Sequence, residues 1–62
     1  MKYYNMTNSE LLNAYNASKE YKPAMCREIC TRAGMHEEYY YADGDNIDRV
    51  MERAVEQLKA SC

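Results

Sequence analysis

Residues 47–58 carry the clearest structural signal in the chain. Apolar side chains recur there at intervals of three and four residues, at Ile47, Val50, Met51, Ala54, Val55 and Leu58. This spacing places all six on one face of an α-helix and the polar residues between them on the other face. The sequence therefore predicts a helix over residues 46–60, and any fold of this chain has to cover its apolar face.

The rest of the chain offers little apolar material to cover that face. It has 62 residues, enough for one domain, with no Phe and no Trp. The predicted core consists of Leu11, Leu12, Met25, Ile29, Met35, Ile47, Val50, Met51, Val55 and Leu58, with Met1 and Met6 near the start. A core of this size seldom supplies more than roughly 3–5 kcal/mol without a staple or a partner. We therefore expect a single domain over residues 1–62 that gains stability by associating with itself or with another protein.

The first half of the chain contains clear helix-start and helix-stop signals. Thr7 and Glu10 have the spacing of a capping box, which predicts a helix that begins at residue 8 after a loose lead-in over residues 1–6. Pro23 disfavours helical backbone in the residue before it and is itself suited to the first turn of a helix. The sequence therefore predicts a first helix over residues 8–21, followed directly by a second.

The second helix is expected over residues 23–33, because Gly34 is the residue type that most easily takes the left-handed conformation at a helix end. The stretch 36–42 is ambiguous, since its three consecutive tyrosines favour a strand but no partner strand is visible. We expect a short helix there, then a turn over residues 43–46. The predicted fold is all-α: a compact small bundle of three main helices (about 8–21, 23–33 and 46–60) with a short fourth helix near 36–42.

Charge is divided unevenly between the two parts of the chain. Residues 1–34 hold five basic and three acidic side chains, a net charge of +2, whereas residues 35–62 hold three basic and seven acidic side chains, a net charge of −4. Nucleic-acid affinity depends on neutralising phosphates, so the acidic part is a poor platform for it. It suits a basic protein surface better, or it is a solvated acidic face.

The start of the chain does not resemble a targeting segment. MKYYNMTNSE contains one Lys and no run of apolar residues, so a signal peptide is not expected. No stretch reaches the apolar length that spans a bilayer. We expect a cytoplasmic protein that does not contact a membrane and whose cysteines are reduced.

Metal and catalytic chemistry find little support in the sequence. Cys26 and Cys30 lie one helical turn apart, and with His36 and Cys62 they make four residues of the types that bind zinc. Structural zinc sites usually take a close-spaced Cys pair from a turn, so we interpret the first two as core residues. The acidic turn over residues 43–46 has Asn where a calcium loop needs Gly. We expect no cofactor, no metal site and no catalytic residue, and hence a protein that is not an enzyme.

The stretch REICTRAGMHEEYYYADGD, over residues 27–45, contains a small-residue bend. It resembles a bacterial helix-turn-helix over residues 28–41, in the spacing of Ile29, Cys30, Ala33, Gly34, Met35 and Tyr40. The resemblance implies that a small residue lets two helices cross, that the Gly makes the turn, and that Tyr40 fills a buried position of the second helix. Residues 36–41 would then be the recognition helix.

That helix departs from the family at the residues that would read DNA. Bases are mostly read by Arg, Lys, Asn and Gln and phosphates are held by Lys and Arg, whereas residues 33–48 contain no Lys or Arg. DNA contacts would have to come from Lys19, Lys22, Arg27 and Arg32. We therefore regard nucleic-acid binding as the alternative, in the form of a dimeric transcriptional regulator.

The preferred hypothesis concerns the tyrosines and carboxylates past the bend. The candidate protein-binding residues are Glu37, Glu38, Tyr39, Tyr40, Tyr41, Asp43 and Asp45. Tyr is enriched at interfaces because it gives contact area and a hydrogen bond with few rotatable bonds. Alternatively, the rings fill out a small core. The sequence thus favours a small bacterial or phage helical protein that binds another protein, as an inhibitor or adaptor, and that can form a homo-oligomer.

Overall fold

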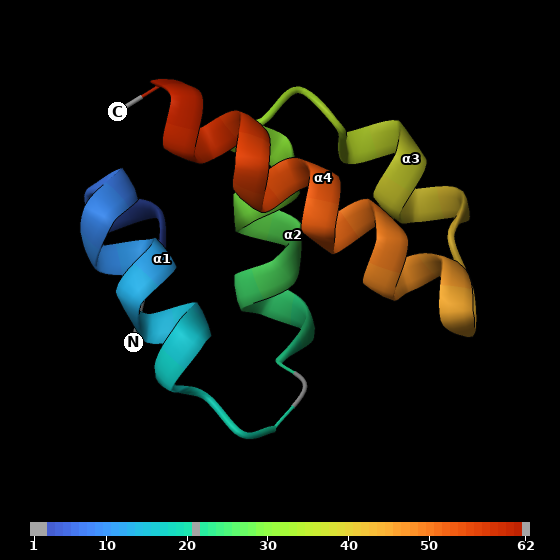
Figure 1. Cartoon of the computed structure of the whole chain (residues 1–62), viewed down its shortest axis with the longest axis horizontal. Coiled ribbons are helices and arrows are strands. Elements are labelled where there is room, and N and C mark those ends of the chain that lie inside the picture. Colours follow the sequence, from blue (N-terminus) through green and yellow to red (C-terminus); the bar gives the residue numbers. More distant parts are fainter. Residues whose placement is uncertain (1–2, 21, 62) are drawn as a thin grey trace.

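Helix α2 (Pro23–Arg32) and helix α4 (Asp45–Ser61) form the centre of the fold, shown in Figure 1. Helix α1 (Asn8–Ala17) and helix α3 (His36–Tyr41) flank α2, and a 3₁₀ turn, η1 (Tyr3–Asn5), packs on α2 near the start of the chain. This computed structural model describes residues 3–20 and 22–61, which contain no strand. The all-α bundle of three main helices and one short helix is therefore confirmed.

The core is the one expected from the apolar pattern, with additions. Eight predicted core residues are buried: Leu11, Leu12, Met25, Ile29, Met35, Met51, Val55 and Leu58. Cys26, Cys30 and Ala54 are buried with them, whereas Ile47, Val50 and Met6 pack against the core from its edge and keep some exposure. Met1 lies outside the described residues. The apolar face of α4 is covered mainly by α2, as the periodicity of that face requires.

Helix α1 starts where the capping box predicts and ends earlier than expected. The Glu10 amide donates to Thr7 Oγ1 at 3.1 Å, and the Thr7 amide donates to Glu10 Oε1 at 2.8 Å. These hydrogen bonds lower the pKa of the Glu10 carboxyl. The predicted end at residue 21 is wrong, because Ser18 is extended and its hydroxyl bonds to the Glu20 backbone, which offers the chain an alternative to another helical turn.

The bend between α2 and α3 depends on Gly34. Its φ is 74°, a left-handed conformation in which other residues are strained. The Met35 amide donates to the Cys30 carbonyl at 2.7 Å and the Gly34 amide donates to the Thr31 carbonyl at 3.2 Å, the two bonds of a Schellman motif. The helix ends at Arg32, one residue before the predicted boundary. Since Met35 is buried, this turn also adds a side chain to the core.

Part of the lead-in expected over residues 1–6 forms η1 and contacts α2. Arg32 ties this segment to α2: its guanidinium donates to the carbonyls of Tyr3 and Tyr4 at 3.1 and 3.3 Å and to Asn8 Oδ1 at 2.9 Å. The same guanidinium donates to Glu28 Oε2 at 2.8 Å, an ion pair within α2. One side chain of α2 therefore holds both η1 and the start of α1 in place.

Candidate functional site

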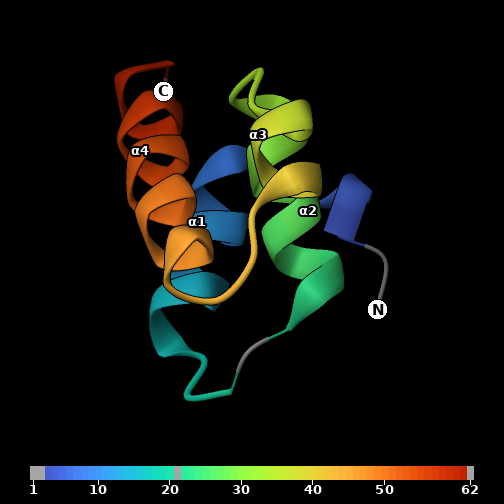
Figure 2. The ribbon, with the colours of Figure 1, turned by 90° about the vertical axis from the view of Figure 1, so that its right-hand side faces the viewer.

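The predicted tyrosine and acidic residues lie on α3, on the turn that follows it and, for Asp45, at the first residue of α4. Figure 2 looks onto this side of the molecule, with α3 above α2 and η1 beside α2. Six of the seven predicted residues are exposed, and we call them the tyrosine–acidic patch: Glu37, Glu38, Tyr40, Tyr41, Asp43 and Asp45. These six exposed side chains therefore come from one continuous stretch of the chain, from α3 to the first residue of α4.

The rings of Tyr40 and Tyr41 are the most exposed large hydrophobic side chains among the described residues. Their relative exposures are 73% and 78%. The ring centroids are 5.0 Å apart and the ring planes meet at 86°, an edge-to-face arrangement that aromatic pairs favour. The pair therefore forms an aromatic surface that the fold leaves exposed to water.

Tyr39 differs from its two neighbours. It is half-buried against the core, and its hydroxyl donates to the Pro23 carbonyl at 3.5 Å, at the start of α2. Consecutive helix residues point about 100° apart, so only one of three adjacent tyrosines faces the core. The two interpretations of the tyrosine run, core or surface, therefore apply to different rings, and Tyr39 belongs to the fold.

The same geometry bears on the bend that resembles a helix-turn-helix. In that resemblance Tyr40 fills a buried position of the second helix, whereas the structure exposes it and buries part of Tyr39. The small-residue turn at Gly34 is present, but the residue expected to anchor α3 is one position earlier in the chain.

The carboxylates of the patch are available for new contacts. Within residues 3–20 and 22–61, the ion pairs join Arg32 to Glu28 and Lys59 to Glu56, so neither involves the patch. Its four carboxylates have no hydrogen-bond partner among the described side chains either. The patch therefore presents negative charge that a partner can use without breaking an internal contact.

The four candidate DNA contacts differ in their exposure and in the residues around them. Lys19, Lys22 and Arg27 are exposed, but Arg32 is half-buried and is occupied by the contacts to η1, α1 and Glu28. Lys19 and Lys22 line a hollow of about 350 Å³ that Glu20 and Asp48 also line, so carboxylates stand beside these cations. Arg27 lines a different hollow, between α2 and α3.

The cysteines of α2 are core residues, as the sequence predicts. Cys26 and Cys30 are buried and free, and Cys30 Sγ lies 3.5 Å from Met51 Sδ. Burial raises the pKa of both thiols, that of Cys30 to about 11. Because the thiolate is the reactive form, neither is suited to nucleophilic chemistry. No group of three or more His, Cys, Asp or Glu side chains with metal-binding geometry occurs in the described part of the chain.

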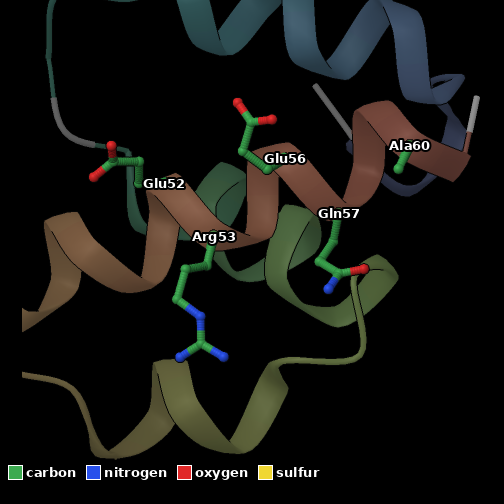
Figure 3. Close-up of a pocket in the computed structure, with 5 residues that line it drawn as sticks. All are labelled: Glu52, Arg53, Glu56, Gln57 and Ala60. Atoms are coloured by element: carbon green, nitrogen blue, oxygen red, sulfur yellow. The ribbon is translucent and has the colours of Figure 1, made fainter.

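Two further hollows involve residues that the sequence did not single out together. One, of about 450 Å³, lies along α4 and is lined by Glu52, Arg53, Glu56, Gln57 and Ala60 (Figure 3). Glu52 and Glu56 point to one side of the helix and Arg53 and Gln57 to the other, so its polar groups do not converge. We assign it no function.

The other hollow lies between α2 and α3. It has a volume of about 410 Å³ and is lined by Arg27, His36, Tyr39, Tyr40, Ala42 and Ile47. In the sequence, His36 stands out only as a residue type that zinc binds. The signal that would have found this site is the spacing of His36, Tyr39 and Tyr40, since residues three and four positions apart on a helix are neighbours and both rings therefore lie next to the histidine.

The chain matches no family model, and no curated protein or solved structure matches it either. Among the described residues, none of the helices has both the length and the apolar character needed to cross a bilayer.

Proposed function

We propose that this protein acts by binding another protein through the tyrosine–acidic patch. The observation that carries the proposal is the exposed edge-to-face pair of Tyr40 and Tyr41, set among four carboxylates without ion-pair partners in the described chain. Tyr has few rotatable bonds and so loses little conformational entropy on binding, and it is among the residues that dominate interface energies.

The proposed partner presents a basic surface. Complementary charge speeds encounter and selects among partners more than it raises affinity, and the tyrosines would supply most of the affinity. Polyanions fit this surface poorly, since Glu37, Glu38, Asp43 and Asp45 would repel phosphates. We propose that the protein is an inhibitor or adaptor of bacterial or phage origin. We propose that it works in the cytoplasm.

Serine substitutions of exposed tyrosines test the proposal. Tyr40→Ser and Tyr41→Ser should each weaken binding to a partner captured from the native host by about tenfold or more, because each removes an interface ring. Tyr4→Ser is the matched control: Tyr4 is 63% exposed but lies outside the patch. Binding is measured by calorimetry with the purified partner, and helicity by circular dichroism. Equal affinity for all three variants would contradict the proposal.

A salt series and a DNA titration separate the protein-binding function from the regulator. Glu37→Gln with Glu38→Gln should slow association with the partner and flatten its salt dependence, because these carboxylates provide the attraction. Fluorescence anisotropy with mixed-sequence duplex DNA at low salt should show no binding at micromolar protein. Steep, salt-sensitive DNA binding that Arg27→Ala abolishes would instead favour the regulator.

A further inference from the structure

Sulfur atoms gather where α2 and α4 pack together. Cys30 Sγ of α2 lies 3.5 Å from Met51 Sδ of α4. Cys26 precedes Cys30 by four residues in α2, and side chains at this spacing are neighbours on a helix. Burial is the larger cause of the raised pKa of Cys30, and the neighbouring Cys26 adds to it. Two thiols and one thioether therefore share one site in the core, which a methionine completes.

This sulfur cluster is sheltered from water but lies beside an opening. Cys26, Cys30 and Met51 have relative exposures of 3%, 0% and 3%. Cys26 and Met51 also line the hollow of about 350 Å³ that Lys19 and Lys22 border, whereas Cys30 does not line it. An ion in the hollow is therefore next to Cys26 and Met51, and Met51 is in contact with Cys30.

The chemistry of the sulfur cluster favours monovalent copper. Thiolate and thioether are soft ligands of the kind that bind Cu(I). Zinc sites take four ligands from Cys, His and carboxylates, so a thioether is not among the usual ligands of zinc. The mouth of the hollow does not select an ion by charge, since two carboxylates and two lysines line it: Glu20, Asp48, Lys19 and Lys22. The sulfur atoms therefore decide which ion fits.

The spacing of the sulfur atoms is close to what one ion needs. Metal–sulfur bonds are about 2.3 Å long, so three sulfurs around one ion lie roughly 4 Å apart. The 3.5 Å between Cys30 Sγ and Met51 Sδ has to widen by only about half an ångström to reach that spacing. Methionine adapts easily to such a change, because its side chain is unbranched and has three rotatable bonds.

We propose that Cys26, Cys30 and Met51 form a binding site for Cu(I). The ion bonds to both cysteine sulfurs and to the methionine sulfur, and each thiol releases its proton to the solvent. Burial raises the pKa of both thiols, so they keep their protons until a bound cation displaces them. The site goes beyond the proposed function, because it uses the core and leaves the tyrosine–acidic patch free. A bound ion would join α2 to α4.

Competition with a Cu(I) chelator tests the site. The wild type and all variants carry Cys62→Ser, which leaves the two cysteines of α2 as the only thiols. Cu(I) supplied as its bicinchoninate complex without oxygen should transfer to the protein at one ion per chain. Met51→Leu should lower the Cu(I) affinity by at least about tenfold, because it removes one ligand and conserves volume. Met6→Leu is the matched control and should leave the affinity unchanged, since Met6 packs at the edge of the core and outside the hollow.

Two further measurements distinguish a built site from loose thiol chemistry. X-ray absorption should show copper surrounded by sulfur alone, and thermal unfolding should move to higher temperature with the ion bound, because the ion binds the folded state. Cys30→Ala should abolish the transfer, and Met51→Leu decides the question if circular dichroism shows that Cys30→Ala is unfolded. No transfer to the folded protein would overturn the inference. Equal affinities of Met51→Leu and Met6→Leu, or helices that unfold as copper binds, would overturn it too.

Discussion

Helices α2 and α3 are joined by one glycine turn and differ in what they bury. Helix α2 buries Met25, Cys26, Ile29 and Cys30, and it contacts every other element of the fold. Helix α3 has no buried residue, and of its side chains only the half-buried ring of Tyr39 packs against the core. The comparison shows that the chain uses one helix to hold the fold together and the next to present side chains to solvent.

The difference follows from the residues of the two helices. In α2 the apolar side chains recur at helical spacing, so one stripe meets the apolar face of α4. Three of the six residues of α3 are consecutive tyrosines, so their rings cannot all share one face of the helix. Changes in α2 should therefore cost stability, and changes in the outer face of α3 should cost binding.

The largest effect is expected at Ile29, which is fully buried in α2. Ile29→Ala should destabilise the fold by about 2–5 kcal/mol, through lost burial and the cavity left behind. Most of the stability of a domain this small would be lost. Tyr41→Ala in α3 should change the free energy of unfolding by less than about 0.5 kcal/mol, since Tyr41 is an exposed residue. Urea unfolding followed by circular dichroism measures both, and equal losses would break the comparison.

An intermediate effect is expected at Arg32, on the side of α2 that holds η1. Arg32→Ala should lower the free energy of unfolding by about 1–3 kcal/mol, because the Tyr3 and Tyr4 carbonyls and the Asn8 side chain lose a charged hydrogen-bond donor. Arg32→Lys should recover little of this, since an ammonium cannot reproduce the planar fork that reaches both Asn8 and the η1 carbonyls. Hydrogen exchange of the Met6 amide, which donates to the Tyr3 carbonyl, reports on η1. A Lys variant as stable and as protected as the wild type would refute this role.

A smaller loss of stability than at Ile29 or Arg32 is expected at Gly34, where the two helices join. Gly34→Ala should cost about 1–2 kcal/mol from left-handed backbone alone, since an added Cβ meets nothing within 4 Å. Gly34→Asn should cost less, because Asn tolerates this conformation better. Thermal unfolding measures both. If the Ala variant is as stable as the wild type, the left-handed turn does not constrain how α3 leaves α2.

The sequence by itself determined the helical elements and most of the core. The Thr7–Glu10 capping box, the stop at Gly34 and the apolar face of residues 47–58 all appear in the structure. Each depends on residues within a few helical turns of one another, so local spacing is sufficient to predict it. The acidic character of the stretch past the bend was readable for the same reason.

Tertiary structure alone decided how the side chains are used. Arg32 was a candidate DNA contact, but in the structure it joins α2 to η1, because carbonyls of η1, far away in sequence, accept hydrogen bonds from its guanidinium. Tyr39 and Tyr40 look alike in sequence, but the direction in which α3 leaves Gly34 turns one toward the core and the other toward water. The hollow between α2 and α3 exists only once both helices are packed. Side chains distant in sequence meet through packing, and no local pattern records which pairs will meet.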